Sequence, residues 1–218
     1  MEFLELFYDC TVVLSGIYYP TSPLVLHHVL EIASHLHAVE RDQNLRQIVY
    51  PMKLKFLKYW PDIPLLYSYA FILDSRAKMR GFHRVLQLLA ASTGTQYNSY
   101  YADVKTELYK LFNKYERKFG AARSQRVTQP SNHIGKRKQA WRRIFGGAGV
   151  AGPSPATTSS SSTSAASELS VYLDSDNVTS YEDDFDILIW WHDHKLTYPI
   201  LSIMAKDIMS VSVSTCSS

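Results

Sequence analysis

Histidine is the side chain in this 218-residue sequence best suited to hold a metal ion, and most of the histidines fall in two groups. One group is the pair His192 and His194, which flank Asp193. The other group lies near the N-terminus and comprises His27, His28, His35 and His37. Residues two apart point to different faces of a helix, and neither group has cysteine or carboxylate partners at zinc-ligand spacing. The sequence therefore predicts no metal site and no cofactor.

Two further patterns bear on enzyme chemistry. Ser75-Arg76-Ala77-Lys78 matches the Ser-x-x-Lys motif of some acyl-transfer enzymes, but the companion motifs do not occur and a capped helix start explains the pattern. An acidic cluster could bind a divalent cation, although acidic residues are also favoured at the positive end of a helix. Its members are Glu182, Asp183, Asp184 and Asp186. Phosphate-binding glycine loops and nucleophile elbows do not occur either. We predict no active site and no small-molecule substrate.

A basic stretch, Lys136-Arg137-Lys138-Gln139-Ala140-Trp141-Arg142-Arg143, is the best candidate for direct contact with a partner. Lysine and arginine can contact nucleic-acid phosphates, and a tryptophan can stack on an exposed base. The candidate nucleic-acid-binding residues are Lys136, Arg137, Lys138, Trp141, Arg142 and Arg143. The same stretch also fits a nuclear localisation signal, and it fits a solvated basic linker.

Charge divides the sequence into three segments. Residues 1–116 carry 12 basic and 11 acidic side chains, residues 117–167 carry nine basic and no acidic ones, and residues 168–218 carry two basic and nine acidic ones. The basic middle and the acidic tail therefore look like separate segments that can attract each other.

Two cysteines are too few for a disulfide framework, and no signal peptide or membrane span is apparent. We expect an intracellular protein.

Hydrophobic periodicity predicts helices on both sides of a low-complexity linker. We expect Ser22 to cap the first of these helices, Pro51 to break or kink the chain, and Gly120 to end the longest helix. Residues 65–73 fit either a buried helix or a strand. Residues 146–167 are almost entirely small and polar, which predicts a flexible linker. The expected helices cover residues 24–36, 52–60, 75–89, 97–119, 185–194 and 199–209.

Longer strings carry a resemblance to a known family. The order of ELSVYLD at 168–174, FDILIWW at 185–191 and LTYPILSIMAKD at 196–207 resembles the opening of the C-terminal dimerisation region of plant hAT-superfamily transposases. The first half resembles the hAT-like RNase H-fold region of RICESLEEPER-type proteins with BED zinc fingers. That likeness is carried by FLELFYDCTVVLSGIYY at 3–19, KFLKYW at 55–60 and AFILDSRAKMRGF at 70–82.

This resemblance implies a mainly α protein with three parts. These are a helical hAT insertion or RNase H-like fragment at 1–120, a basic then Ser/Gly/Pro-rich disordered linker at 121–167, and a short helical segment at 168–218 that begins the dimerisation region. It also implies apolar contact residues for pairing protomers, and the alternative is that these residues pack in the chain's own core. The candidates are Trp190, Trp191, Tyr198, Leu201, Met204 and Ala205.

Catalysis is not expected of this chain. hAT transposases use three acidic residues to position metal ions for strand transfer and bind DNA through a BED zinc finger. Neither the acidic triad nor the cysteine and histidine set of the finger can be assigned in this sequence. We predict a non-catalytic, nuclear, hAT transposase-derived protein that pairs with itself or a related hAT protein, with DNA as a further partner. The alternative is an inactive fragment of a transposase enzyme that works only within a longer polypeptide.

Overall fold

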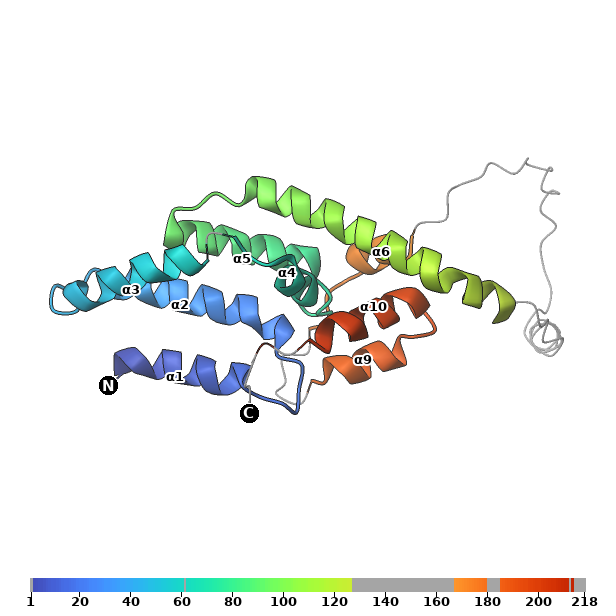
Figure 1. Ribbon diagram of the computed structural model, residues 1–218, viewed down its shortest axis with the longest axis horizontal. Coiled ribbons are helices and arrows are strands. Elements are labelled where there is room, and N and C mark those ends of the chain that lie inside the picture. The colour runs from blue at the N-terminus through green and yellow to red at the C-terminus, as the bar shows by residue number, and fades with distance from the viewer. Residues whose placement is uncertain (1, 61, 127–166, 180–184, 212, 214–218) are drawn as a thin grey trace, which may run out of the picture.

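The computed structural model describes residues 2–60, 62–126, 167–179, 185–211 and 213, and every regular element in these ranges is helical (Figure 1). The prediction of a mainly α fold is therefore confirmed. None of the described helices combines the length and the apolar character that crossing a membrane requires. The elements are α1 (Glu2–Leu14), the 3-10 helix η1 (Ser22–Leu24), α2 (Val25–Val39), α3 (Arg46–Tyr59), α4 (Leu65–Ile72), α5 (Lys78–Thr93), α6 (Asn98–Arg126), α8 (Glu168–Asp174), α9 (Ile187–Asp193) and α10 (Pro199–Met209).

Periodicity located most of these helices correctly. The patterns at 24–36, 185–194 and 199–209 become α2, α9 and α10, and the ambiguous stretch at 65–73 becomes the helix α4. In α2 the buried positions recur at helical spacing, so one apolar face is turned to the core. α4 is buried on more than one side, which explains why its sequence shows no clear period.

Three local signals were misleading. α3 continues through Pro51, so of the break or kink expected there the break is wrong. The proline removes one helical hydrogen bond, while Val49 is buried and the partly buried Phe56 packs on the core. Gly120 does not end α6, which runs on to Arg126. Ser22 does not cap α2, because its buried hydroxyl has no hydrogen-bond partner. In each case tertiary packing outweighs a local preference worth about 1–3 kcal/mol.

One hydrophobic core joins the helices that precede and follow residues 127–166. α2, α4, α5 and α6 contribute buried residues such as Leu26, Phe82 and Leu108, and the last three helices contribute Tyr172 and Trp191. Figure 1 shows α10 lying next to α4 and α6, which it contacts, with α9 on its other side. The acidic C-terminal segment is thus part of the same folded body as the N-terminal helices.

The end of α4 provides the anchor points for this docking. A helix leaves its last carbonyl groups without partners in the helix, and burial makes an unpaired carbonyl costly. The hydroxyl of Tyr172 donates to the carbonyl oxygen of Ile72 at 3.1 Å, and Nε1 of Trp191 donates to the carbonyl oxygen of Leu73 at 3.0 Å. Both aromatic side chains are fully buried. Two residues of the C-terminal segment therefore complete the hydrogen bonding of α4.

A second anchor lies where α5 begins. Lys78 is buried, and its Nζ donates to the carbonyl oxygens of Ser175 and Asp176 at 2.9 and 2.7 Å and to the Ser175 hydroxyl at 2.7 Å. Burial lowers the pKa of the Lys78 ammonium group. Asn177 Nδ2 donates to the carbonyl oxygen of Arg76 at 2.9 Å beside it. The lysine of the Ser-x-x-Lys pattern therefore holds backbone carbonyls, as a structural residue does.

We predict that Trp191→Ala lowers the free energy of unfolding by about 3–5 kcal/mol, because it removes a fully buried indole and leaves the Leu73 carbonyl without its donor. Urea unfolding followed by circular dichroism measures the change. Leu196→Ala is the matched control, because Leu196 is 88% exposed and its removal should change stability by less than about 0.5 kcal/mol. Equal losses in the two variants would contradict the docking described above.

α6 and α10 are also joined by a polar contact at the surface. The Tyr115 hydroxyl donates to Oδ2 of Asp207 at 2.9 Å. Desolvation, followed by the hydrogen bond to Asp207, raises the pKa of Tyr115 from 10.0 to about 12. The folded chain therefore keeps this phenol proton at pH values where the unfolded chain has lost it.

Stability should accordingly fall as the pH rises from about 10 to about 12, since the unfolded state then binds fewer protons than the folded state. In Tyr115→Phe the decline over this window should be shallower, though not abolished, because burial also raises the pKa of Tyr69 to about 12. Urea unfolding of parent and variant at several alkaline pH values measures the two slopes. An identical slope in both would contradict the Tyr115 assignment.

Candidate functional site

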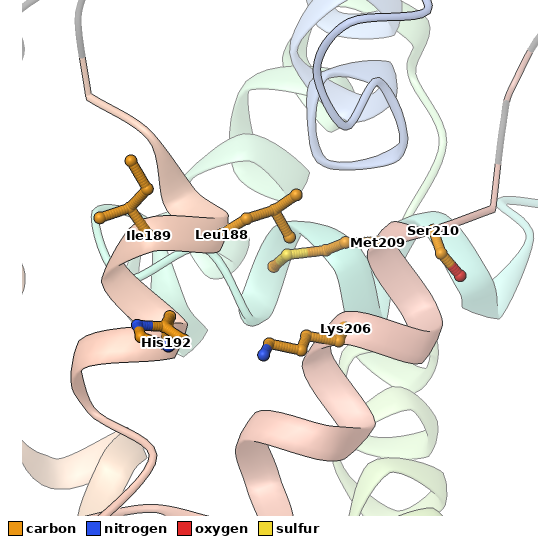
Figure 2. Close-up of a pocket in the computed structure, with 6 residues that line it drawn as sticks. All are labelled: Leu188, Ile189, His192, Lys206, Met209 and Ser210. Carbon is orange, nitrogen blue, oxygen red and sulfur yellow. The ribbon is translucent and has the colours of Figure 1, made fainter.

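An apolar groove of about 510 Å³ lies between α9 and α10 (Figure 2). Figure 2 shows Leu188 and Met209 pointing toward each other across the groove, with His192 and Lys206 further along it. Hydrocarbon forms most of the lining, so the groove suits apolar side chains better than a polar ligand. The lining residues are Leu188, Ile189 and His192 from α9, Lys206 and Met209 from α10, and Ser210 directly after α10.

The orientation of α9 follows from one cap and one buried face. Ile187 and Trp191 are four residues apart, lie on the same side of the helix and are buried. Oδ1 of Asp186 accepts from the backbone N–H groups of Leu188 and Ile189 at 2.7 and 3.1 Å, so the first turn is closed at this point. Leu188 and Ile189 are thereby left 37% and 59% exposed.

α10 is fixed at its first turn by a carboxylate from α8. Oε1 of Glu168 accepts from the backbone N–H of Leu201 at 2.8 Å. Leu201 is the third residue of α10, where an N–H has no partner within the helix, and a negative charge is favourable at this end. Glu168 comes from the ELSVYLD string, so this motif has a physical role in placing the C-terminal helix.

The six predicted dimer-interface residues lie largely inside this chain. Trp190, the partly exposed one, stacks on the His194 ring with a centroid distance of 3.9 Å. Their packing corresponds to the alternative that they form the core, and a role in contacting a second protomer stays a prediction. The buried members are Trp191, Tyr198, Leu201, Met204 and Ala205.

Sequence reasoning missed the exposed residues on the other side of these helices. Leu188 and Ile189 stand beside the two tryptophans in sequence, and the predicted interface includes the tryptophans but neither of these residues. A helical wheel contains the signal, because Ile189 lies on the side of α9 away from Trp191. An isoleucine on that side has no place in the core that Ile187 and Trp191 help to form.

Several other predicted residues lie outside the described part of the chain. The acidic cluster is described only at Asp186, where the helix-terminus interpretation is confirmed. Nothing in the structure tests nucleic-acid contact. The residues concerned are Glu182, Asp183 and Asp184, and the basic set Lys136, Arg137, Lys138, Trp141, Arg142 and Arg143.

One prediction about the histidines is wrong, because His28 does have a cysteine and a carboxylate beside it. Its Nδ1 lies 3.4 Å from Sγ of Cys10 and 2.8 Å from Oε2 of Glu31. Glu31 follows His28 by three residues on the same face of α2, whereas Cys10 comes from α1. A search for ligand spacing along the sequence does not find Cys10, because only tertiary packing brings it next to His28.

Comparison with known families agrees with this architecture. A model of the hAT-like transposase, RNase-H fold matches residues 23–115, and a model of the hAT family C-terminal dimerisation region matches residues 168–218. The groove between α9 and α10 lies within the second match. The two matches together mark a helical, transposase-type module that includes a dimerisation region. The chain belongs to the hAT family of transposase-related proteins.

The relatives are plant proteins. The chain is 29% identical to the zinc finger BED domain-containing protein RICESLEEPER 1 of Oryza sativa subsp. japonica over 223 residues, which is 100% of this chain and 30% of that protein. It is 26% identical to DAYSLEEPER of Arabidopsis thaliana (97% of this chain, 28% of the relative). It is 25% identical to the putative AC transposase of Zea mays (99% and 26%). The chain thus spans less than a third of the length of these curated relatives, and no solved structure matches it.

Asp186→Ala should destabilise the chain by about 1 kcal/mol, because two backbone N–H groups at the start of α9 lose their acceptor. Asp186→Asn should retain most of the stability, since asparagine is also a good cap. Urea unfolding measures both. Asp193→Ala is the control at the other end of α9, where a carboxylate is unfavourable and its loss should be neutral or slightly stabilising. Equal effects at both ends would contradict the capping role.

Proposed function

We propose that this chain associates with a second copy of itself, or with a related hAT protein, through the exposed face of α9 and α10. The observation that carries the proposal is an exposed apolar groove within the range that matches the hAT dimerisation region. Soluble proteins seldom leave contiguous apolar side chains exposed on their surface unless that surface binds a partner. Leu188, Ile189 and Met209 form the centre of this face, and Lys206 and His192 belong to its polar rim.

The groove alone is too small for a stable interface, which typically covers about 800 Å² on each partner. A neighbouring hollow extends it, because this second pocket shares Leu188, Met209 and Ser210 with the first and continues over the loop at 16–21. Ile17 and Tyr18 in that loop are 80% and 94% exposed. A continuous apolar face therefore runs from α9 and α10 onto the loop after α1. It has the mixture of aliphatic and aromatic side chains that interface centres favour.

The proposed role is non-catalytic. Several of the described carboxylates serve the fold: Glu168 and Asp186 hold the starts of α10 and α9, and Asp207 accepts from Tyr115. Asp74 likewise pairs with Arg76, whose Nη2 lies 2.7 Å from Oδ2 of Asp74. This supports a part in association, with strand transfer left to other chains or segments.

Nuclear location and contact with DNA complete the proposal. They rest on the basic composition of 136–143 and on the family of the relatives, among them BED zinc finger proteins and putative transposases. Phosphate contacts by such a stretch would be independent of the apolar face and sensitive to salt. Association and nucleic-acid binding are therefore separable properties of this chain.

Sedimentation velocity of the full chain over a range of concentrations tests the association. We expect a concentration-dependent dimer in the parent, and in Ile189→Asp a dissociation constant raised at least about tenfold, because a charge would be buried at the centre of the face. Ile48→Asp on α3 is the matched control, with an isoleucine 55% exposed against 59% for Ile189. The control should dimerise like the parent.

A parent that stays monomeric at every concentration would contradict self-association and favour the alternative that the chain works only within a longer polypeptide. Truncation before residue 168 is a poor substitute for these variants. It would remove Tyr172 and Trp191 from the core, so loss of a dimer could not be separated from loss of the fold.

A further inference from the structure

A cysteine, a histidine and a glutamate converge where α1 packs on α2, away from the groove. Sγ of Cys10 lies 3.4 Å from Nδ1 of His28, and the same nitrogen lies 2.8 Å from Oε2 of Glu31. One ligand atom from each residue lies within 4.8 Å of the other two. α1 and α2 run side by side in Figure 1, so the cluster bridges two elements. A thiol, an imidazole and a carboxylate are the three commonest zinc-binding groups of proteins.

The two helices present these groups in a fixed arrangement. His28 and Glu31 are three residues apart and therefore share one face of α2. Cys10 is 4% exposed and points from α1 toward that face, and the side chains of His28 and Glu31 are 12% and 37% exposed. The cluster is thus buried on the cysteine side and open on the glutamate side. A cation can enter from solvent and still meet a largely dehydrated thiol.

We propose that Cys10, His28 and Glu31 form a three-residue site for one Zn²⁺ ion, with water as the fourth ligand. Tetrahedral zinc with Zn–S near 2.3 Å and Zn–N near 2.0 Å separates sulfur and nitrogen by about 3.5 Å. The Cys10–His28 distance of 3.4 Å already meets this requirement. The His28–Glu31 contact has to open by about 0.5 Å, which a partly exposed glutamate can do by rotating its side chain.

The other carboxylate oxygen of the site also has a partner. Oε1 of Glu31 lies 3.2 Å from Nε2 of His27, so Glu31 is positioned by a second histidine in the way that outer groups orient metal ligands. Burial, followed by the charges of Glu31 and Asp9, raises the pKa of the Cys10 thiol in the metal-free chain. A divalent cation reverses this balance: Cys10 binds as the thiolate, and its proton leaves to solvent.

Cobalt substitution tests the site in the full chain. Titration with Co²⁺ should give one bound ion with the near-ultraviolet absorption of a cobalt–thiolate bond, and Zn²⁺ should displace it. Cys10→Ser should abolish that absorption. Glu31→Gln leaves the packing of α1 unchanged and should weaken Zn²⁺ affinity at least about tenfold. Cys216→Ser and His83→Ala, which alter a thiol elsewhere in the sequence and an exposed imidazole on α5, should bind like the parent.

The contrary results are equally definite. A thiolate band that disappears with Cys216→Ser and persists in Cys10→Ser would overturn the assignment, and so would the absence of any such band in the parent. Unchanged Zn²⁺ affinity in Glu31→Gln would show that Glu31 is not a ligand and would overturn the three-residue site. Circular dichroism of each variant separates loss of the metal from loss of the fold.

Discussion

The buried end of α4 has carbonyl groups that need hydrogen-bond donors, and the positions of α8, α9 and α10 depend on this need. Its last carbonyl groups, those of Ile72 and Leu73, are in the buried core, where water cannot serve as their donor. Tyr172 and Trp191 supply the missing donors from about a hundred residues further along the chain. Meeting this requirement places α8 and α9, and α10 follows through the carboxylate of Glu168. The apolar groove is thus a consequence of how the carbonyl groups at the end of α4 obtain their hydrogen-bond donors.

This dependence changes how the two family matches relate to each other. The RNase-H-type and dimerisation models match separate ranges of the sequence, yet residues of both ranges form one core. The outer face of α9 is therefore presented by a body that includes the N-terminal helices. A rigidly held apolar face loses less conformational entropy on association than a free helix would, because folding has already ordered its backbone and side chains. Zinc at Cys10, His28 and Glu31 would extend that rigidity to α1.

The sequence predicted the helices better than it predicted their contacts. Periodicity located α2, α9 and α10 because each turns one apolar face to the core. It failed at Pro51 and Gly120 because packing against neighbouring helices outweighs a single residue's preference. The partners of Trp191 and His28 could not be predicted, since Leu73 and Cys10 reach them only through tertiary folding. The predicted interface residues lie mainly on the buried faces of α9 and α10, whereas other residues of these helices line the groove.

Lys78 has a consequence for the order of events during synthesis. Its φ of 50° is unusual for a residue with a side chain and costs about 1–3 kcal/mol, which its three hydrogen bonds to Ser175 and Asp176 help to offset. A ribosome makes Lys78 97 residues before Ser175, so these three side-chain hydrogen bonds are missing while the chain is growing. Contacts of such long sequence separation form late and slowly. The hydrogen bonds that hold Lys78 can therefore form only after Ser175 and Asp176 have been synthesised.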